Sequence, residues 1–272
     1  MKLLFCGDVV GRSGRDAVLK YIPLLKEHHK LDVIVVNGEN AAGGFGITGT
    51  IGKSFFEAGI DILTTGNHVW RQKDVVSYIS TEKRLLRPIN FSNKSLPGSG
   101  IGIHPLKDGR HFIVLHAIAR LYMPDLVDCP FQAIDQVLAT VSLSQKNIAG
   151  IMLDFHGEAT SEKMAMAHFL DGRVSFVVGT HTHIPTADHQ ILPKKTAYQT
   201  DAGMCGVYNS VIGMDKKVPV ARFLGKFIDL KMEPAEGEAT LCGAIVDIDD
   251  ETGLARDIMP VRLGGFLSQT GL

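Results

Sequence analysis

The sequence lacks several features that would restrict its class at once. No stretch approaches the roughly 18 consecutive apolar residues of a membrane-spanning helix, so we expect no membrane partner. The 272 residues carry a formal net charge of only −1, from 28 basic and 29 acidic side chains. This balance gives no overall electrostatic argument for binding nucleic acid or a membrane surface, although a local basic patch would be compatible with it.

Cysteine is also scarce, and its spacing excludes two common roles. The absence of any C-x-x-C pair argues against a zinc finger, and the scatter argues against a disulfide framework. Only four apolar residues follow Met1-Lys2 before Gly7-Asp8, which is not the pattern of a secretory signal. We therefore expect a cytoplasmic, reducing location. The four cysteines are Cys6, Cys129, Cys205 and Cys242.

The first 70 residues repeat one pattern three times: an apolar run, a polar tip and then a helical segment. This order predicts a parallel sheet with right-handed crossovers. Apolar residues make up 45% of the chain and charged residues 21%, which is enough apolar surface for one large core. We expect a single α/β domain over residues 1–272. The three predicted strands are Leu3–Cys6, Asp32–Val36 and Ile60–Leu63.

Later segments predict further strands. Residues 101–105 and 111–117 have the pattern of a hairpin, and apolar runs at 148–155 and 174–178 have that of buried strands. Beyond Asp201 the pattern changes to antiparallel strands, which we expect to complete a second sheet over about residues 226–263. These are Lys226–Met232, Thr240–Ile248 and Leu254–Leu263.

Two histidines follow the run at 174–178 directly. Alternate residues of an extended chain point the same way, about 7 Å apart, so His181 and His183 are expected to face one point. Two imidazoles placed in this way can bind one metal ion, or one each of two neighbouring ions. The plainer alternative is a pair of histidines that hydrogen-bond a loop.

Other polar residues also follow predicted strands, and a common sheet edge would bring them together. Carboxylate, amide and imidazole donors without thiolate suit Mn²⁺, Fe²⁺ or Zn²⁺. Seven or eight ligands are too many for one ordinary site, but they suit two ions about 3.5–4 Å apart, an arrangement that acts on phosphate esters. The set is Asp8, Glu39, Asn40, Asn67, His68, His156, His181 and His183.

The order of these blocks resembles the calcineurin-like metallophosphoesterases. Three segments, at 7–11, 37–42 and 155–163, are similar to the bacterial YmdB-like branch of that superfamily. The resemblance implies a layered α/β sandwich with two central mixed sheets flanked by helices. Four positions depart from the wider family: Val10 replaces a metal-binding histidine, Glu39 replaces an aspartate, and Val69 replaces the acidic residue after Gly-Asn-His. Thr180 precedes the first histidine of the final His-x-His pair. The blocks are Gly7-Asp8, Gly38-Glu39, Gly66-Asn67-His68, His156 and Gly179 to His183.

The resemblance also implies a function and roles for the residues. It implies a dinuclear phosphodiesterase in which a hydroxide bridging the metals attacks phosphorus and His68 protonates the leaving oxygen. The implied metals are two divalent ions, iron or manganese first and zinc as an alternative. The implied substrates are phosphodiesters, 2′,3′-cyclic nucleotides especially. A phosphomonoesterase and a nucleotide-binding or RNA-related regulatory protein with little turnover are the alternatives, and a homo-oligomer is compatible with either.

By position, one metal would be bound by Asp8, Asn40 and His183, and the other by Asn67, His156 and His181. Glu39 would bridge both ions.

Overall fold

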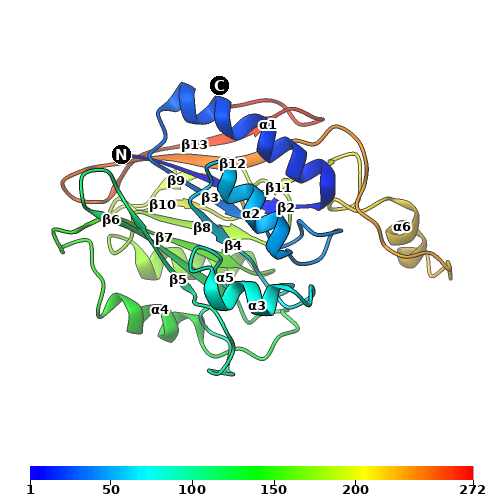
Figure 1. Cartoon of the computed structure of the whole chain (residues 1–272), viewed down its shortest axis with the longest axis horizontal. Coiled ribbons are helices and arrows are strands. Elements are labelled where there is room, and N and C mark those ends of the chain that lie inside the picture. The colour runs from blue at the N-terminus through cyan, green and yellow to red at the C-terminus, as the bar shows by residue number, and fades with distance from the viewer. Residues whose placement is uncertain (272) are drawn as a thin grey trace.

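Two mixed β-sheets lie face to face at the centre of the molecule (Figure 1). The computed structural model describes residues 1–271. The first sheet has the strand order β13-β12-β1-β3-β4, in which β1, β3 and β4 are parallel. The second has the order β5-β6-β7-β8-β10-β9, in which β6, β7, β8 and β10 are parallel. The prediction of two mixed sheets is confirmed.

The strands of the first sheet are β1 (Lys2–Cys6), β3 (Val33–Asn37), β4 (Ile62–Thr64), β12 (Leu241–Ile248) and β13 (Ala255–Leu263). Those of the second are β5 (Ile101–Pro105), β6 (His111–Ile118), β7 (Ile148–His156), β8 (Phe176–Thr180), β9 (Gln190–Ile191) and β10 (Ala197–Gln199). A short separate pair consists of β2 (Asp8–Val9) and β11 (Met204–Cys205).

Successive residues of a strand point to opposite faces of its sheet, and in β1 the residues on both faces are apolar. Leu3 and Phe5 of β1 point into the core between the sheets, whereas Leu4 and Cys6 point to the outer face. Both faces are buried because helices cover the outer side of each sheet. Full burial of a leucine or phenylalanine side chain is worth roughly 1.5–3 kcal/mol, so the strands anchor the arrangement.

The helices form the two outer layers (Figure 1). Helices α1 and α2 pack on the first sheet, and α3 joins the same apolar cluster. Helices α4 and α5 pack on the second sheet. Helix α6 extends from the body of the molecule (Figure 1). The bounds are α1 (Gly11–His29), α2 (Gly49–Glu57), α3 (Val75–Thr81), α4 (Pro130–Leu138), α5 (Thr160–Leu170) and α6 (Lys217–Phe223).

The C-terminal strands differ from the prediction in two ways. Strands β12 and β13 do not form a sheet apart from the N-terminal strands, because β12 pairs antiparallel with β1 in the first sheet. The segment Lys226–Met232, predicted as a strand, is not one. Apolar and polar residues alternate from Ile228 onward, but Phe227 is 94% exposed and Leu230 is 56% exposed, so the segment buries no apolar face against a sheet.

The carboxyl ends of the parallel strands in both sheets open on one region. The prediction of a single common sheet edge is therefore wrong: β1, β3 and β4 belong to one sheet, and β7 and β8 to the other. Facing sheets bring the ends of their strands together as effectively as one sheet would. Among residues 1–271, no helix is both long and apolar enough to cross a membrane.

Candidate metal centre

The structure brings all eight predicted residues into one cluster, and each contacts at least one other member. Asp8 lies in the short strand β2, directly after β1 of the first sheet, and four further members follow β3 and β4 of that sheet. From the second sheet, one member ends β7 and two follow β8. The members after β3 are Glu39 and Asn40, those after β4 are Asn67 and His68, and those of the second sheet are His156, His181 and His183.

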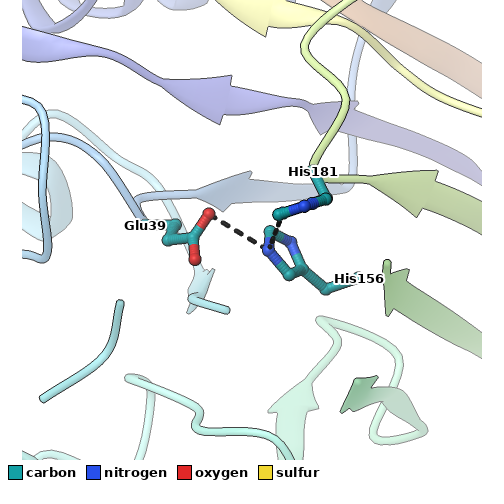
Figure 2. A group of neighbouring side chains, drawn as sticks. All are labelled: Glu39, His156 and His181. Atoms are coloured by element: carbon teal, nitrogen blue, oxygen red, sulfur yellow. Dashed lines mark hydrogen bonds and ion pairs between the residues drawn. The ribbon is translucent and has the colours of Figure 1, made fainter. Parts of the chain in front are cut away.

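His156 lies at the middle of one half of the cluster, as Figure 2 shows for three of its members. Its Nε2 atom is 3.1 Å from Glu39 Oε2 and 3.1 Å from His181 Nδ1. Asn67 Oδ1 lies 3.1 Å from the same nitrogen. Two ring nitrogens that face each other at this distance repel unless a proton or a cation lies between them. The geometry therefore favours a positive charge at this point.

The other half of the cluster shares Glu39. Donor atoms of Asp8, Glu39 and His183 lie within 4.8 Å of one another, and so do those of Glu39, His156 and His181. Asp8 Oδ1 is buried and has no hydrogen-bond partner, which is costly for a carboxylate oxygen. An unpaired buried oxygen that faces a histidine and a second carboxylate suits a cation. The residues present thus fit two metal ions with Glu39 common to both.

The three histidines share a feature that orients metal ligands in general. In each ring one nitrogen faces the cluster, and the other is held from outside by a different group. Such outer partners fix the orientation of the ring and the position of its proton. The pairs are His156 Nδ1 with Thr180 Oγ1 at 2.9 Å, His183 Nδ1 with the Ile212 carbonyl at 2.8 Å, and His181 Nε2 with Glu158 Oε2 at 3.4 Å.

A glycine allows the side chains to come so close. A Cβ atom at Gly66 would lie 2.5 Å from both Glu39 Oε1 and His156 Nε2. Any other residue at this position would push the carboxylate and the imidazole apart. The glycine that precedes Asn67 is therefore required by the space of the cluster itself.

Burial and neighbouring charges together set the pKa values of the cluster. Burial raises the pKa of Asp8 to about 7, although His183 and His156 oppose this. Burial lowers the pKa of His181 to about 3, and His156 lowers it further. Burial alone would also lower the pKa of His156, but Glu39 and Asp8 outweigh it and raise that pKa to about 9. Burial would raise the pKa of Glu39, but the charge of His156 and their hydrogen bond hold it below its usual range.

His68 is a partly exposed member of the cluster, and it contacts the buried side chain of Asn40. Nδ1 of His68 lies 2.9 Å from Asn40 Oδ1, while the backbone N–H of His68 donates to Glu39 Oε1 at 2.9 Å. The ring is about one-fifth exposed and packs edge-on against Phe45, with 5.1 Å between centroids. Burial lowers the pKa of His68, and Glu39 opposes this. The amide nitrogen of Asn40 faces His183 Nε2 at 3.2 Å, so in this orientation its oxygen is turned to His68.

The predicted extended geometry of the two histidines after β8 is wrong, although both face the cluster. Strand β8 ends at Thr180, and the φ angles of His181 and His183 are 98° and 68°. Both residues therefore lie in the left-handed region, which residues with a Cβ atom seldom adopt. A tight turn, and not the alternation of a strand, directs both rings to the cluster.

Sequence reasoning missed a buried network behind His156. Asp154, within β7, is fully buried and accepts hydrogen bonds from Thr180 Oγ1 at 2.7 Å and Thr64 Oγ1 at 2.6 Å. Asn37 Nδ2 donates to the same carboxylate at 2.9 Å. Because Thr180 also contacts His156, the network fixes that ring from behind. In the sequence, this network is indicated by one feature alone, the charged Asp154 inside the long apolar run at 148–155.

Known proteins are similar to this chain over most of its length. A family profile described as "YmdB-like protein" matches residues 4–261. A protein of Bacillus subtilis (strain 168), described as 2′,3′-cyclic-nucleotide 2′-phosphodiesterase, is 44% identical over 252 residues, which cover 93% of each chain.

Two solved structures are similar over nearly the whole chain. One, of a hypothetical protein from Thermus thermophilus, has a TM-score of 0.88 at 37% identity and covers 97% of this chain and 100% of its own. The other, of a phosphatase from Mycoplasma pneumoniae, has a TM-score of 0.88 at 30% identity, with 97% and 93% covered. The predicted resemblance is confirmed: the fold is that of the metallophosphoesterases, and the chain belongs to the YmdB-like protein family.

Proposed function

We propose that this chain is a metal-dependent phosphodiesterase that hydrolyses small phosphodiesters, 2′,3′-cyclic nucleotides in particular. The observation that carries the proposal is the pair of donor triads that share the buried carboxylate of Glu39. The activity for which the Bacillus subtilis relative is named supports the choice of diester and of nucleotide. The metallophosphoesterase fold implies divalent metal ions.

The ligand sets follow from the two halves of the cluster. Asp8, Asn40 and His183 would bind one ion, and Asn67, His156 and His181 would bind the other, with Glu39 shared. When bound, such a pair of cations supplies positive charge that stabilises the phosphoryl oxygens and lowers the pKa of the attacking water. Both imidazole and carboxylate accept iron, manganese and zinc, and we propose iron or manganese.

Asn40 has to turn its amide to act as a ligand. Its nitrogen faces His183 and its oxygen faces His68, and a half-turn of the terminal amide exchanges the two atoms. After the exchange, the amide N–H would donate to Nδ1 of His68. The proton of a neutral His68 would then reside on Nε2, the nitrogen not held by Asn40.

This arrangement makes His68 the proton donor of the reaction. It contacts Asn40 and Glu39, and its ring is about one-fifth exposed, so a substrate bound at the metal ions would reach it from solvent. In hydrolysis, the P–O bond to the leaving group breaks as the bond from water oxygen to phosphorus forms. The proton on Nε2 of His68 would pass to the departing oxygen, which would otherwise leave as an alkoxide, and the ring would take up the proton that the attacking water loses.

The test is hydrolysis by protein that has been stripped of metal with a chelator and then reloaded with Mn²⁺ or Fe²⁺. We expect turnover of bis(p-nitrophenyl) phosphate and of 2′,3′-cyclic AMP by the reloaded protein and none by the stripped protein. Elemental analysis of the reloaded protein should find about two ions per chain. Turnover of p-nitrophenyl phosphate alone would favour a phosphomonoesterase, in keeping with the Mycoplasma pneumoniae structure, which is described as a phosphatase. Equal turnover by the stripped protein would overturn the proposal.

Metal binding should also release protons at neutral pH. With pKa values of about 9 and about 7 in the metal-free chain, His156 is protonated at pH 7 and Asp8 partly so. A ligand atom must lose its proton to bind a cation, so the affinity for Mn²⁺ should rise with pH up to about 9 and then level off. Calorimetric titrations in buffers of different ionisation enthalpy should report the release of roughly one to two protons near pH 7. An affinity that stays constant from pH 6 to 9 would contradict these pKa shifts.

A further inference from the structure

The turn that carries His181 and His183 needs external support. Both residues adopt positive φ angles, which are unfavourable for residues with a Cβ atom. Thr182 lies between them, so whatever holds Thr182 sets the direction of both rings. The turn persists only if its surroundings favour this conformation over an ordinary extended one.

Asp201 supplies that support from a neighbouring strand. It follows β10, which pairs with β8, and its side chain is fully buried. Its Oδ2 atom accepts hydrogen bonds from the backbone N–H of Thr182 at 3.1 Å and from Thr182 Oγ1 at 2.7 Å. Its Oδ1 atom accepts one from the backbone N–H of Gly203 at 2.9 Å. One carboxylate thus joins the centre of the turn to the end of β10.

Lys163 is the counter-charge of this carboxylate. It lies in the first turn of α5, is 1% exposed, and its Nζ atom is 2.9 Å from Asp201 Oδ2. A Cβ atom at Gly179 would lie 2.7 Å from Lys163 Cδ, so the lysine chain crosses β8 where the strand has no side chain. Without the ammonium group, the buried carboxylate would have no charged partner. The ion pair therefore keeps in place the acceptor that Thr182 uses.

We propose that Lys163 and Asp201 are positioning residues of the metal centre, acting through Thr182 on the directions of His181 and His183. This inference rests on the proposed function, because it assigns the two histidines to metal ions. The ion pair has no direct contact with Glu39 or with His68. Loss of the ion pair should therefore weaken metal binding but leave the catalytic rate largely unchanged once both metal sites are filled.

The experiment has two measurements. Calorimetric titration of the metal-stripped protein with Mn²⁺ gives the metal affinity, and the rate of bis(p-nitrophenyl) phosphate hydrolysis is measured as the Mn²⁺ concentration is raised. Partners that orient metal ligands typically contribute about 10–100-fold to metal affinity. We expect the variant Lys163→Met to bind Mn²⁺ about 10–100-fold more weakly, with much of kcat restored at saturating Mn²⁺. The variant Thr182→Ala removes one hydrogen bond and leaves no unpaired charge, so it should fold and show a smaller shift in the same direction.

A matched control lies at the other end of β8. Ser175 is fully buried, accepts a hydrogen bond from the backbone N–H of Ile151 and donates one to the Gly253 carbonyl. Ser175→Ala should therefore lower stability without changing Mn²⁺ affinity. The inference is overturned if Lys163→Met and Thr182→Ala lose stability as Ser175→Ala does but bind Mn²⁺ as tightly as the wild type. Absence of Mn²⁺ binding by the wild type itself would overturn the proposed function, and this inference with it.

Discussion

Glu39→Gln will lose both metal ions and reduce phosphodiester hydrolysis to background. The substitution keeps the shape of the side chain but removes its charge and turns one of its two acceptor oxygens into an N–H donor. Glu39 is 1% exposed and is the one residue common to both donor triads. The measurements are elemental analysis of the purified variant and its turnover of bis(p-nitrophenyl) phosphate with added Mn²⁺.

The same variant allows a test that does not depend on metal. In the metal-free chain, Glu39 is the first of the charges that raise the pKa of His156 against the effect of burial. Removing that charge should therefore lower the pKa of His156, which is measurable by NMR titration of the ring. A pKa that stays near 9 in Glu39→Gln would show that the ion pair between these residues is not what raises it.

The control is Glu57→Gln, the same chemical change at an exposed residue at the end of α2. It should keep two ions per chain and full activity. If Glu39→Gln also keeps two ions at wild-type affinity, Glu39 is not shared between them, and the assignment of the ligand sets falls.

The positions of these ligands could be predicted because they depend on a local rule. A polar residue directly after an apolar strand lies at the carboxyl end of that strand, whichever sheet the strand joins. Asp8 after β1, Glu39 after β3 and His156 at the end of β7 all follow this rule. The rule does not say which strands share a sheet, so it predicted one common edge where two facing sheets meet.

Features that depend on distant partners could not be predicted in this way. Strand β12 pairs with β1 through contacts such as Lys2 with Asp247, which no local pattern encodes. The turn at His181 and His183 depends on Asp201, 18 residues beyond His183 in sequence. Buried charges such as Lys163 and Asp154 contradict the local pattern of their elements until their partners are known.

Replacing His68 by alanine should separate proton transfer from metal binding. The variant should keep both ions, because the hydrogen bond of residue 68 to Glu39 comes from the backbone N–H, which alanine retains. Its kcat for 2′,3′-cyclic AMP should fall about 10²–10⁴-fold, the usual contribution of a general acid. The control is His189→Ala, which removes an exposed histidine outside the cluster and should leave kcat unchanged.

The choice of leaving group distinguishes proton donation from other roles of His68. A p-nitrophenolate leaves readily without a proton, whereas the alkoxide of a ribose hydroxyl does not. The defect of His68→Ala should therefore be much smaller with bis(p-nitrophenyl) phosphate than with 2′,3′-cyclic AMP, and added imidazole should restore part of the lost rate. An equal defect with both substrates would mean that the ring binds the phosphate and does not protonate the departing oxygen. In that case the contact between His68 and Asn40 would serve to orient a binding group, and another proton donor would have to reach the leaving atom.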